Sequence, residues 1–152
     1  MQPNLTNQSA LYGVAINQIC VKLDAAWQAE YHSQAHVYPL PTRSHRVVGL
    51  LQLRGEIVPV FDPSDAGNLS QGRTSVHNVL VIFVEGKWLG VVVKQEPMPV
   101  PHTQPSNVRK PSSPFEQALH DPNLASDGSG TIWWSLNAPQ FFEQLSKEKS
   151  IA

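Results

Sequence analysis

Two long apolar stretches, each broken once by a short polar bend, constrain this chain more than any other feature. They are VVGLLQLRGEIVPVF at 47–61 and VLVIFVEGKWLGVVV at 79–93, and each bend contains a glycine. Runs of β-branched residues favour strands, and glycine supplies the positive φ that a tight reversal needs. The sequence therefore predicts two β-hairpins, with bends at 54–56 and 85–87. The nearly continuous apolar runs of the second hairpin indicate strands that are covered on both faces.

Three residues of the first stretch are expected to act on the backbone. Gly49 favours a close approach of another backbone segment, and Gly55 favours the turn itself. Pro59 has no N–H to donate to a neighbouring strand, and such residues occur at sheet edges or bulges. We therefore expect the strand that contains Pro59 to be an edge strand or to be bulged there.

The N-terminal part of the chain contains shorter elements. Residues 11–23 alternate partly between apolar and polar positions and predict one strand and the turn into another. Residues 24–36 are rich in Ala, Gln and Glu, which predicts a helix. Asp24 would cap this helix, and Trp27 and Tyr31 would lie four positions apart on one face.

The last third of the chain has a different composition. Residues 95–114 hold six prolines, which oppose regular ladders and helix. Segment 114–120 predicts one or two helical turns, 127–130 a turn, and 131–136 a short strand. The final segment, 138–149, predicts a helix whose apolar side consists of Phe141, Phe142 and Leu145. Many short strands and few helices predict a mainly-β barrel or sandwich.

Composition and charge exclude several classes of protein. The chain has 152 residues, 41% hydrophobic and 15% charged, which suits one globular domain. A formal net charge of −1 argues against a broad electrostatic grip on nucleic acid or anionic lipid. A small β-barrel that binds nucleic acid or another unrelated ligand stays open as the alternative. The single cysteine, an N-terminus without a secretory pattern and the lack of an apolar run of ~20 residues favour a cytoplasmic protein that does not enter the membrane.

Arg54, in the first bend, has two interpretations. It is either an anchor that forks onto a partner protein, or it pins the hairpin through an internal carboxylate such as Glu56 or one in a loop. Leu51, Leu53 and Val58 are equally open, because such residues usually fill a core. A binding protein also needs an exposed apolar patch, and they could supply it.

No residue pattern indicates catalysis or a metal site. His32 and His36 are spaced like a helical metal pair, but a third ligand is missing. Cys20 lies in an apolar strand and is expected to be a buried, unreactive thiol. Trp133 and Trp134 are expected to point one inward and one outward from their strand. Because no nucleophile, base and orienting group stand in a recognisable spacing, we expect no enzyme activity and no cofactor.

The stretch GLLQLRGEIVPVFD at 49–62 resembles the signature of CheW-like domains, the adaptors of bacterial chemoreceptor arrays. The family pattern is a Leu-Pro lead-in, here Leu40-Pro41, then Gly-[Ile/Leu/Val]-x-Asn-Leu-Arg-Gly-x-Ile-[Leu/Val]-Pro-Val-[Val/Ile]-Asp. The hairpin at 79–93 and the closing segment IWWSLNAPQFF at 132–142 are similar to later parts of the family.

The resemblance implies a fold and a function. The fold is mainly β over residues 11–145, with two small SH3-like five-stranded β-barrels on a shared core and a short C-terminal helix, flanked by tails at 1–10 and 146–152. The function is that of an adaptor without catalysis, cofactor or metal. It would couple methyl-accepting chemoreceptors to the regulatory domain of a CheA-type histidine kinase for flagellar or pilus motility. Its place would be the cytoplasm, at receptor arrays on the inner membrane.

The resemblance also assigns residues. Those expected to bind partners are Arg54, Glu56, Leu51, Leu53 and Val58, and those expected to shape the motif are Gly49, Gly55, Pro59 and Asp62. Two positions depart from the family pattern, since Gln52 and Lys94 stand where the family has Asn and Asp.

Overall fold

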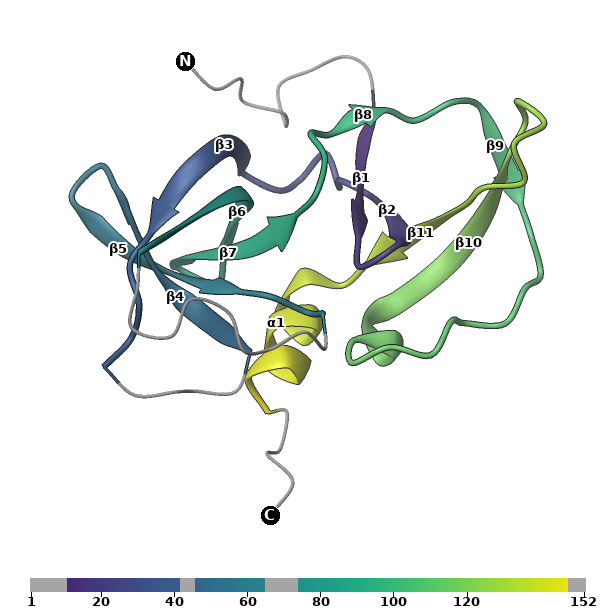
Figure 1. The fold of residues 1–152 in the computed structure, drawn as a ribbon. Helices are drawn as coiled ribbons and strands as arrows, with labels where there is room; N and C mark the ends of the chain where they lie inside the picture. Colours follow the sequence, from purple (N-terminus) through teal and green to yellow (C-terminus); the bar gives the residue numbers. More distant parts are fainter. Residues whose placement is uncertain (1–10, 42–45, 65–73, 148–152) are drawn as a thin grey trace.

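The computed structural model describes residues 11–41, 46–64 and 74–147 and consists mainly of two β-sheets (Figure 1). The first sheet has five strands, in the spatial order β3 (Ala29–Val37), β6 (Ser75–Val84), β7 (Lys87–Val93), β5 (Glu56–Phe61) and β4 (Val47–Leu53). The second has six, in the order β8 (Met98–Pro99), β1 (Tyr12–Ile16), β2 (Ile19–Lys22), β11 (Ile132–Leu136), β10 (Leu119–Ala125) and β9 (Thr103–Pro105).

The two sheets curl like half-barrels, as expected, and helix α1 (Ala138–Ser146) packs between them (Figure 1). The second sheet has six strands and not five because the two-residue β8 joins its edge. The predicted tail at 1–10 lies outside the described residues, and so does 146–152 except for its first two residues. Within the described part of the chain, no helix has the length and apolar character needed to cross a bilayer.

Both predicted hairpins are present, and their bends have the same geometry. β4 pairs with β5 and β6 pairs with β7, each antiparallel. Arg54 and Gly55 have φ of 49° and 83°, and Glu85 and Gly86 have φ of 50° and 85°. Two successive positive φ angles are typical of the turn that matches the natural twist of paired strands, and glycine takes the second position without strain.

The first sheet closes on itself at one corner. Tyr38, just past the end of β3, exchanges two backbone hydrogen bonds with Leu50 of β4, at 2.8 and 2.7 Å. Gly49 permits this contact, since a Cβ there would lie 2.2 Å from the carbonyl oxygen of Tyr38. The strands at opposite ends of the sheet order therefore meet, and the predicted close approach at Gly49 is confirmed.

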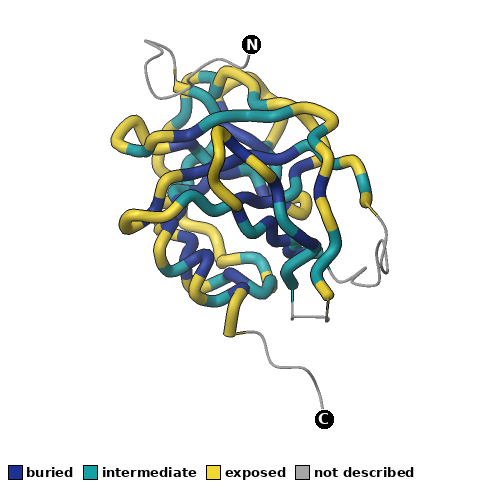
Figure 2. The backbone as a smooth tube through the Cα atoms, turned by 90° about the vertical axis from the view of Figure 1, so that its left-hand side faces the viewer, coloured by how far each residue is buried: buried dark blue, intermediate teal, exposed yellow. Residues whose placement is uncertain are grey.

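Two apolar clusters result from this arrangement. The larger lies between the two sheets and α1, and the smaller lies inside the curl of the first sheet. Figure 2 shows the buried segments gathered in the interior, with exposed residues along the loops and bends.

The predicted C-terminal helix is confirmed as α1, although it ends at Ser146 and not at residue 149. The side chain of Asn137 caps its start by accepting a hydrogen bond from the N–H of Gln140 at 2.9 Å. Phe141 and Phe142 are buried with Leu145, as expected. Phe141 makes an edge-to-face ring contact with Phe115, which directly precedes the short 3-10 helix η2 (Glu116–Ala118), at a centroid distance of 4.9 Å. Phe142 makes a similar contact with Phe61 of β5 at 5.5 Å.

The predicted helix over 24–36 is wrong. Asp24 caps only a local turn, in which its Oδ1 accepts the N–H of Ala26 at 2.8 Å, and β3 begins three residues later. Ala29 and Tyr31 of β3 stand opposite Ile82 and Leu80 of β6, so their apolar surface joins the core. Pairing with a neighbouring strand outweighs the weak helix preference of Ala, Gln and Glu.

The expected edge position of Pro59 is also wrong, because β5 is an internal strand between β7 and β4. Its pairing with β7 begins at Val60, which stands opposite Gly90, one residue after the proline. The irregularity lies in β4, where the register shifts between Val47 and Gly49. The proline thus sits in a stretch of β5 whose β7 side is unpaired, which removes the cost of its missing N–H.

The two tryptophans of β11 lie on opposite faces of the strand, as alternation predicts, and both are buried. Trp134 belongs to the larger core cluster, at 4% exposed, and Trp133 is 3% exposed on the other face of the strand. Gly13 makes room for it, since a Cβ on Gly13 would lie 2.3 Å from the Trp133 ring. The indole N–H of Trp133 has no hydrogen-bond partner among the described residues.

Strand β10 was not predicted at all. Its segment contains Pro122 and an Asp121 with φ of 50°, and its pairing with β11 shifts register between His120 and Asn123. These features hide a strand from propensity and periodicity. The proline-rich segment that precedes it forms only the short strands β8 and β9, in keeping with its composition.

Candidate protein-interaction site

The side chain of Arg54 reaches from the β4–β5 bend to Glu30 of β3 and forms a two-pronged ion pair. Arg54 Nη1 donates to Glu30 Oε1 at 3.0 Å, and Nη2 donates to Oε2 at 2.8 Å. The Arg54 Cζ also lies 5.7 Å from the ring centroid of Trp88 in β7, within the range of a cation–π contact. We call Arg54, Glu30 and Trp88 the clasp, because together they tie the bend to the far strand of the same sheet.

The clasp holds Glu30 in its charged form. The hydrogen bond from Arg54 is the main reason that the pKa of Glu30 lies below its ordinary value of 4.5, and it outweighs the opposing effect of partial burial. His32 adds a smaller contribution through its Nε2, 3.1 Å from Glu30 Oε1. The same hydrogen bond raises the pKa of Arg54. The pair is therefore fully ionised at neutral pH.

The geometry decides between the two interpretations of Arg54 only in part. An internal carboxylate is present, and it is Glu30 of β3, whereas no hydrogen bond joins Arg54 to Glu56. Because Glu30 falls in a segment predicted to be helical, the sequence could not indicate this pairing. The Arg54 side chain is still 58% exposed, so its role as an anchor for a partner stays a prediction, as does that of the exposed Glu56.

Leu51, Leu53 and Val58 lie inside the first sheet, where they are 7%, 8% and 0% exposed. They belong to the smaller apolar cluster, and their role in binding a partner stays a prediction. The exposed apolar side chain of this hairpin is Ile57, at 65%, directly opposite Gln52. Strict alternation along β5 places Ile57 on the face opposite Val58, so the sequence pattern could have indicated that Ile57 is exposed.

The remaining motif residues act on the backbone. Gly55 occupies the second position of the bend, and Pro59 stands opposite Leu50 in the β4–β5 pair. Asp62 follows β5; its N–H donates to the carbonyl oxygen of Arg46 at 2.8 Å, and its Oδ1 accepts the N–H of Ser64 at 2.9 Å. These contacts direct the chain out of the hairpin.

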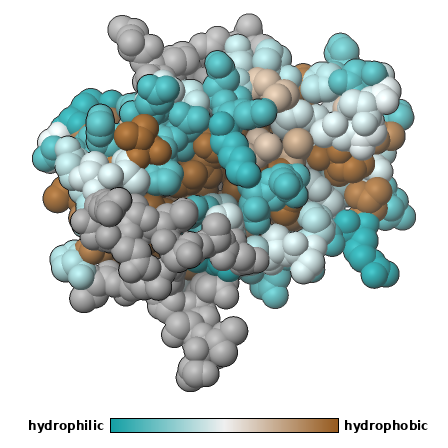
Figure 3. Space-filling view, in the orientation of Figure 1, coloured by the Kyte–Doolittle hydropathy of each residue, from teal (hydrophilic) through white to brown (hydrophobic). Residues whose placement is uncertain are grey.

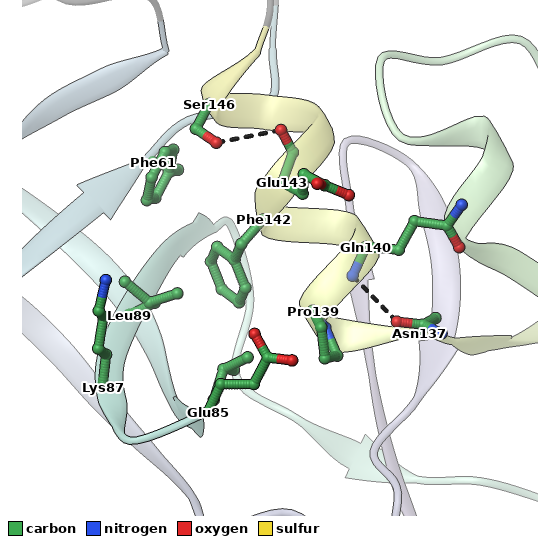
Figure 4. Close-up of a pocket in the computed structure, with 11 residues that line it drawn as sticks. Phe61, Glu85, Lys87, Leu89, Asn137, Pro139, Gln140, Phe142, Glu143 and Ser146 are labelled. Carbon is green, nitrogen blue, oxygen red and sulfur yellow. Dashed lines mark hydrogen bonds between the residues drawn. The ribbon is translucent and has the colours of Figure 1, made fainter.

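A groove with a volume of about 690 Å3 lies between the end of the β6–β7 hairpin and α1 (Figure 4). Phe61, Leu89 and Phe142 contribute apolar surface, and Glu85 and Lys87 of the hairpin contribute opposite charges. A concave site with an apolar part and a few polar groups suits side chains of a partner. Figure 3 shows a face of the molecule on which apolar patches alternate with polar ones.

Metal or catalytic chemistry finds no support in the described residues. His32 and His36 lie on a strand and not on a helix, so the spacing of a helical metal pair does not apply to them. No group of three or more His, Cys, Asp or Glu side chains comes together in the part of the chain that the structure describes. Cys20 is only partly buried, and burial raises the pKa of its thiol, which disfavours the reactive thiolate.

Comparison with known families shows to which family the chain belongs. Residues 11–119 match the family model described as CheW-like domain. The chain belongs to the CheW-like domain family. The motif at 49–62, both hairpins and the clasp all lie within the matched range.

A solved CheW structure has the same fold. The scaffolding protein TtCheW from Thermoanaerobacter tengcongensis superposes with a TM-score of 0.62 at 16% sequence identity, over 93% of this chain and 94% of that chain. A search of curated proteins finds no match. CheW-like domains form a family of scaffolds without catalytic activity, in line with the expectation that this chain is not an enzyme.

The two departures from the CheW-like pattern are both on the surface. Gln52 and Lys94 are exposed, and the carbonyl oxygen of Lys94 accepts a hydrogen bond from the side chain of Asn78 at 3.2 Å. Asn78 also accepts the N–H of Gln34 at 2.9 Å, in the irregular part of β3. Neither departure interrupts the core, so the CheW-like fold tolerates both.

Proposed function

We propose that this chain is a non-catalytic adaptor of a bacterial chemosensory system, which couples chemoreceptors to a CheA-type histidine kinase. The observation that carries the proposal is the CheW-like family match over residues 11–119, combined with a fold of two half-barrels that resembles a CheW scaffold. Its place of action is then the cytoplasm, next to the receptor arrays of the inner membrane, with a flagellar or pilus motor as the output.

The surface offers features of the kind that such coupling requires. The groove between the β6–β7 hairpin and α1 is concave and partly apolar, which suits a helix of a receptor. Arg54 joins the β4–β5 bend to Glu30 of β3 while leaving much of its own side chain exposed. An adaptor of this kind recognises partners by shape and apolar contact, and needs no chemical step.

A reconstitution tests the proposal. Receptor-containing membranes are mixed with the CheA-type kinase of the same organism, with and without this chain, and sedimented. We expect kinase to sediment with the membranes only when the chain is present, and the chain to bind the isolated regulatory domain in a pull-down. The proposal is wrong if the folded wild-type chain binds neither kinase nor receptor from any cognate pair of that organism.

A further inference from the structure

The two half-barrels differ in how their sheets end. The first sheet closes on itself, because Tyr38 just past β3 exchanges backbone hydrogen bonds with Leu50 of β4. The second sheet ends at β8 on one side and at β9 on the other. A strand at the end of a sheet presents unpaired N–H and C=O groups, and a further strand can add to them. The two end strands of the second sheet are therefore the places where the backbone of another chain could attach.

Strands β8 and β9 belong to one stretch of chain, residues 97–106, which borders both ends of the sheet. Only three residues separate the two strands in the sequence. Val100 donates its N–H to the carbonyl oxygen of Leu11 at 2.9 Å, and the carbonyl oxygen of His102 accepts the N–H of Ser126 at 2.7 Å. The stretch thus pairs first with β1 and then with β10, and Figure 1 shows it passing from one to the other.

Hydrogen bonding gives this stretch an inward and an outward series of residues. In an antiparallel pair, every second residue directs its N–H and C=O to the neighbouring strand, and the residues between direct theirs away. Val100 and His102 point inward, and Ser106 continues their series by donating to the carbonyl oxygen of Pro122 at 3.0 Å. The even-numbered residues therefore point inward and the odd-numbered ones outward. The outward residues are Pro97, Pro99, Pro101, Thr103 and Pro105.

Proline occupies four of these five outward positions and none of the inward ones. Proline has no N–H, so an outward proline loses no hydrogen bond to β1 or β10. This explains how a stretch so rich in proline still pairs with a strand at each end of the sheet. It also removes nearly all the donors that a further strand would need on the outward side.

We propose that the alternating prolines of residues 97–105 prevent another strand from adding to the second half-barrel. Their outward side offers carbonyl oxygens but only one N–H, that of Thr103, whereas strand addition needs donors and acceptors in alternation. Pro99 and Pro105 are exposed, so at these points the missing donor, and not a covering segment, keeps a strand away. Other proteins can then bind this edge through side chains only, whichever partners the chain has.

Two single proline substitutions test the assignment of inward and outward positions. Thr103→Pro completes the outward series and removes no hydrogen bond, whereas Gln104→Pro removes an N–H that faces Leu124 of β10. We expect Thr103→Pro to keep the urea midpoint of the wild type and Gln104→Pro to lower it. Equal midpoints in the two variants would show that the two series are misassigned and would overturn the proposal.

Restoring the donors tests the block itself. The edge variant combines Pro97→Thr, Pro99→Thr and Pro101→Thr, because threonine favours strands and adds a polar hydroxyl. The control combines Pro111→Thr and Pro114→Thr, which lie in the same part of the chain but outside every strand. Far-UV CD establishes that both variants are folded, and Pro99→Thr alone takes the place of an edge variant that is not.

Analytical ultracentrifugation then measures self-association with rising concentration, and hydrogen exchange follows the amides that the substitutions introduce. We expect the edge variant to self-associate more than the wild type. Its introduced amides should exchange about tenfold or more slowly in the associated form, because they donate to the added strand. The control should sediment like the wild type.

Two results would overturn the proposal. A folded edge variant that sediments like the wild type would show that the prolines are not what keeps a strand away. Self-association with introduced amides that still exchange freely would show that the contact uses side chains and not the backbone. Neither result depends on binding to kinase or receptor, so the proposed function stands or falls separately.

Discussion

Arg54 donates two hydrogen bonds to Glu30, a residue 24 positions earlier in the chain, and so connects the β4–β5 bend with the strand at the other end of the sheet order. Tyr38 and Leu50 make the second connection between β3 and β4. One connection is an exposed ion pair and the other is a pair of backbone hydrogen bonds. The two should therefore differ in how much the fold depends on them.

Removing the clasp should leave the fold intact. Arg54→Ala loses the ion pair and the contact with Trp88, but no backbone hydrogen bond and no core side chain. We expect an unchanged far-UV CD spectrum, faster amide hydrogen exchange in the β4–β5 bend and, under the proposed function, weaker coupling of kinase to receptor. Adding Glu30→Gln to Arg54→Ala should shift the urea midpoint little further, because the pair is already broken.

Glu56→Gln is the matched control for the clasp, because this carboxylate is near Arg54 but makes no hydrogen bond with it. It should not alter hydrogen exchange in the bend. A loss of β-sheet signal in Arg54→Ala would show instead that the clasp is required for folding and that its role is purely structural.

A charge inside the first half-barrel should unfold the protein. Val60 is 0% exposed within the smaller cluster, so the carboxylate of Val60→Asp would be buried without a partner. The cost is several kcal/mol, a large part of the roughly 5–15 kcal/mol that stabilises a typical domain. Ile57→Asp, three positions away on the other face and 65% exposed, should fold normally. Urea unfolding followed by tryptophan fluorescence compares them, and a cooperative, native-like Val60→Asp would show that the facing of β5 is misassigned.

The parts of the fold that could be predicted are those whose signal is local. Both hairpins follow from apolar runs around a glycine bend, and α1 follows from the apolar side that Phe141, Phe142 and Leu145 form. Strand β3 could not be predicted in the same way, because its helix-favouring composition is overruled by pairing with β6. Strand β10 was hidden by Pro122 and by the left-handed backbone of Asp121.

In the candidate site, too, the features that could be predicted are local ones, and those that depend on topology could not be. The positions of Gly49 and Gly55 follow from backbone demands that any sequence must meet, and both roles are present in the structure. The partner of Arg54 depends on which strand lies across the sheet, and that is a matter of topology. A pairing with Glu30 could not be inferred while residues 24–36 were expected to be helical.

Closure of the first half-barrel should depend on the absence of a side chain at position 49. In Gly49→Ala the new Cβ would lie 2.2 Å from the carbonyl oxygen of Tyr38, a backbone atom that cannot move without breaking the β3–β4 contact. Gly86→Ala is the matched control, because its Cβ would have open space and only the positive φ of 85° is unfavourable. That control should lose roughly 1–2 kcal/mol of unfolding free energy. Gly49→Ala should lose more unfolding free energy than this control. Equal losses would show that the β3–β4 contact adjusts to the new Cβ without a loss of stability.

The partial burial of His77 should make the fold less stable as the pH drops below 6.5, the ordinary pKa of histidine. His77 is half-buried, and burial lowers its pKa from the ordinary value of 6.5, against a smaller opposite effect of Asp62. Its Nε2 lies 2.9 Å from the hydroxyl oxygen of Ser75. As the pH falls below 6.5, the unfolded chain takes up a proton that the folded chain accepts only at lower pH. The unfolded state is thereby favoured, and the free energy of unfolding decreases.

His77→Gln isolates this contribution, because glutamine is neutral at every pH of the experiment and can still hydrogen-bond to Ser75. Urea unfolding is measured for both proteins at several values between about pH 7.5 and about pH 5.5. We expect the free energy of unfolding to decline less steeply in the variant than in the wild type, since one group that binds protons preferentially in the unfolded state has been removed. Identical slopes would mean that His77 takes up its proton equally well in the folded and unfolded chain, and that its partial burial does not oppose its charging.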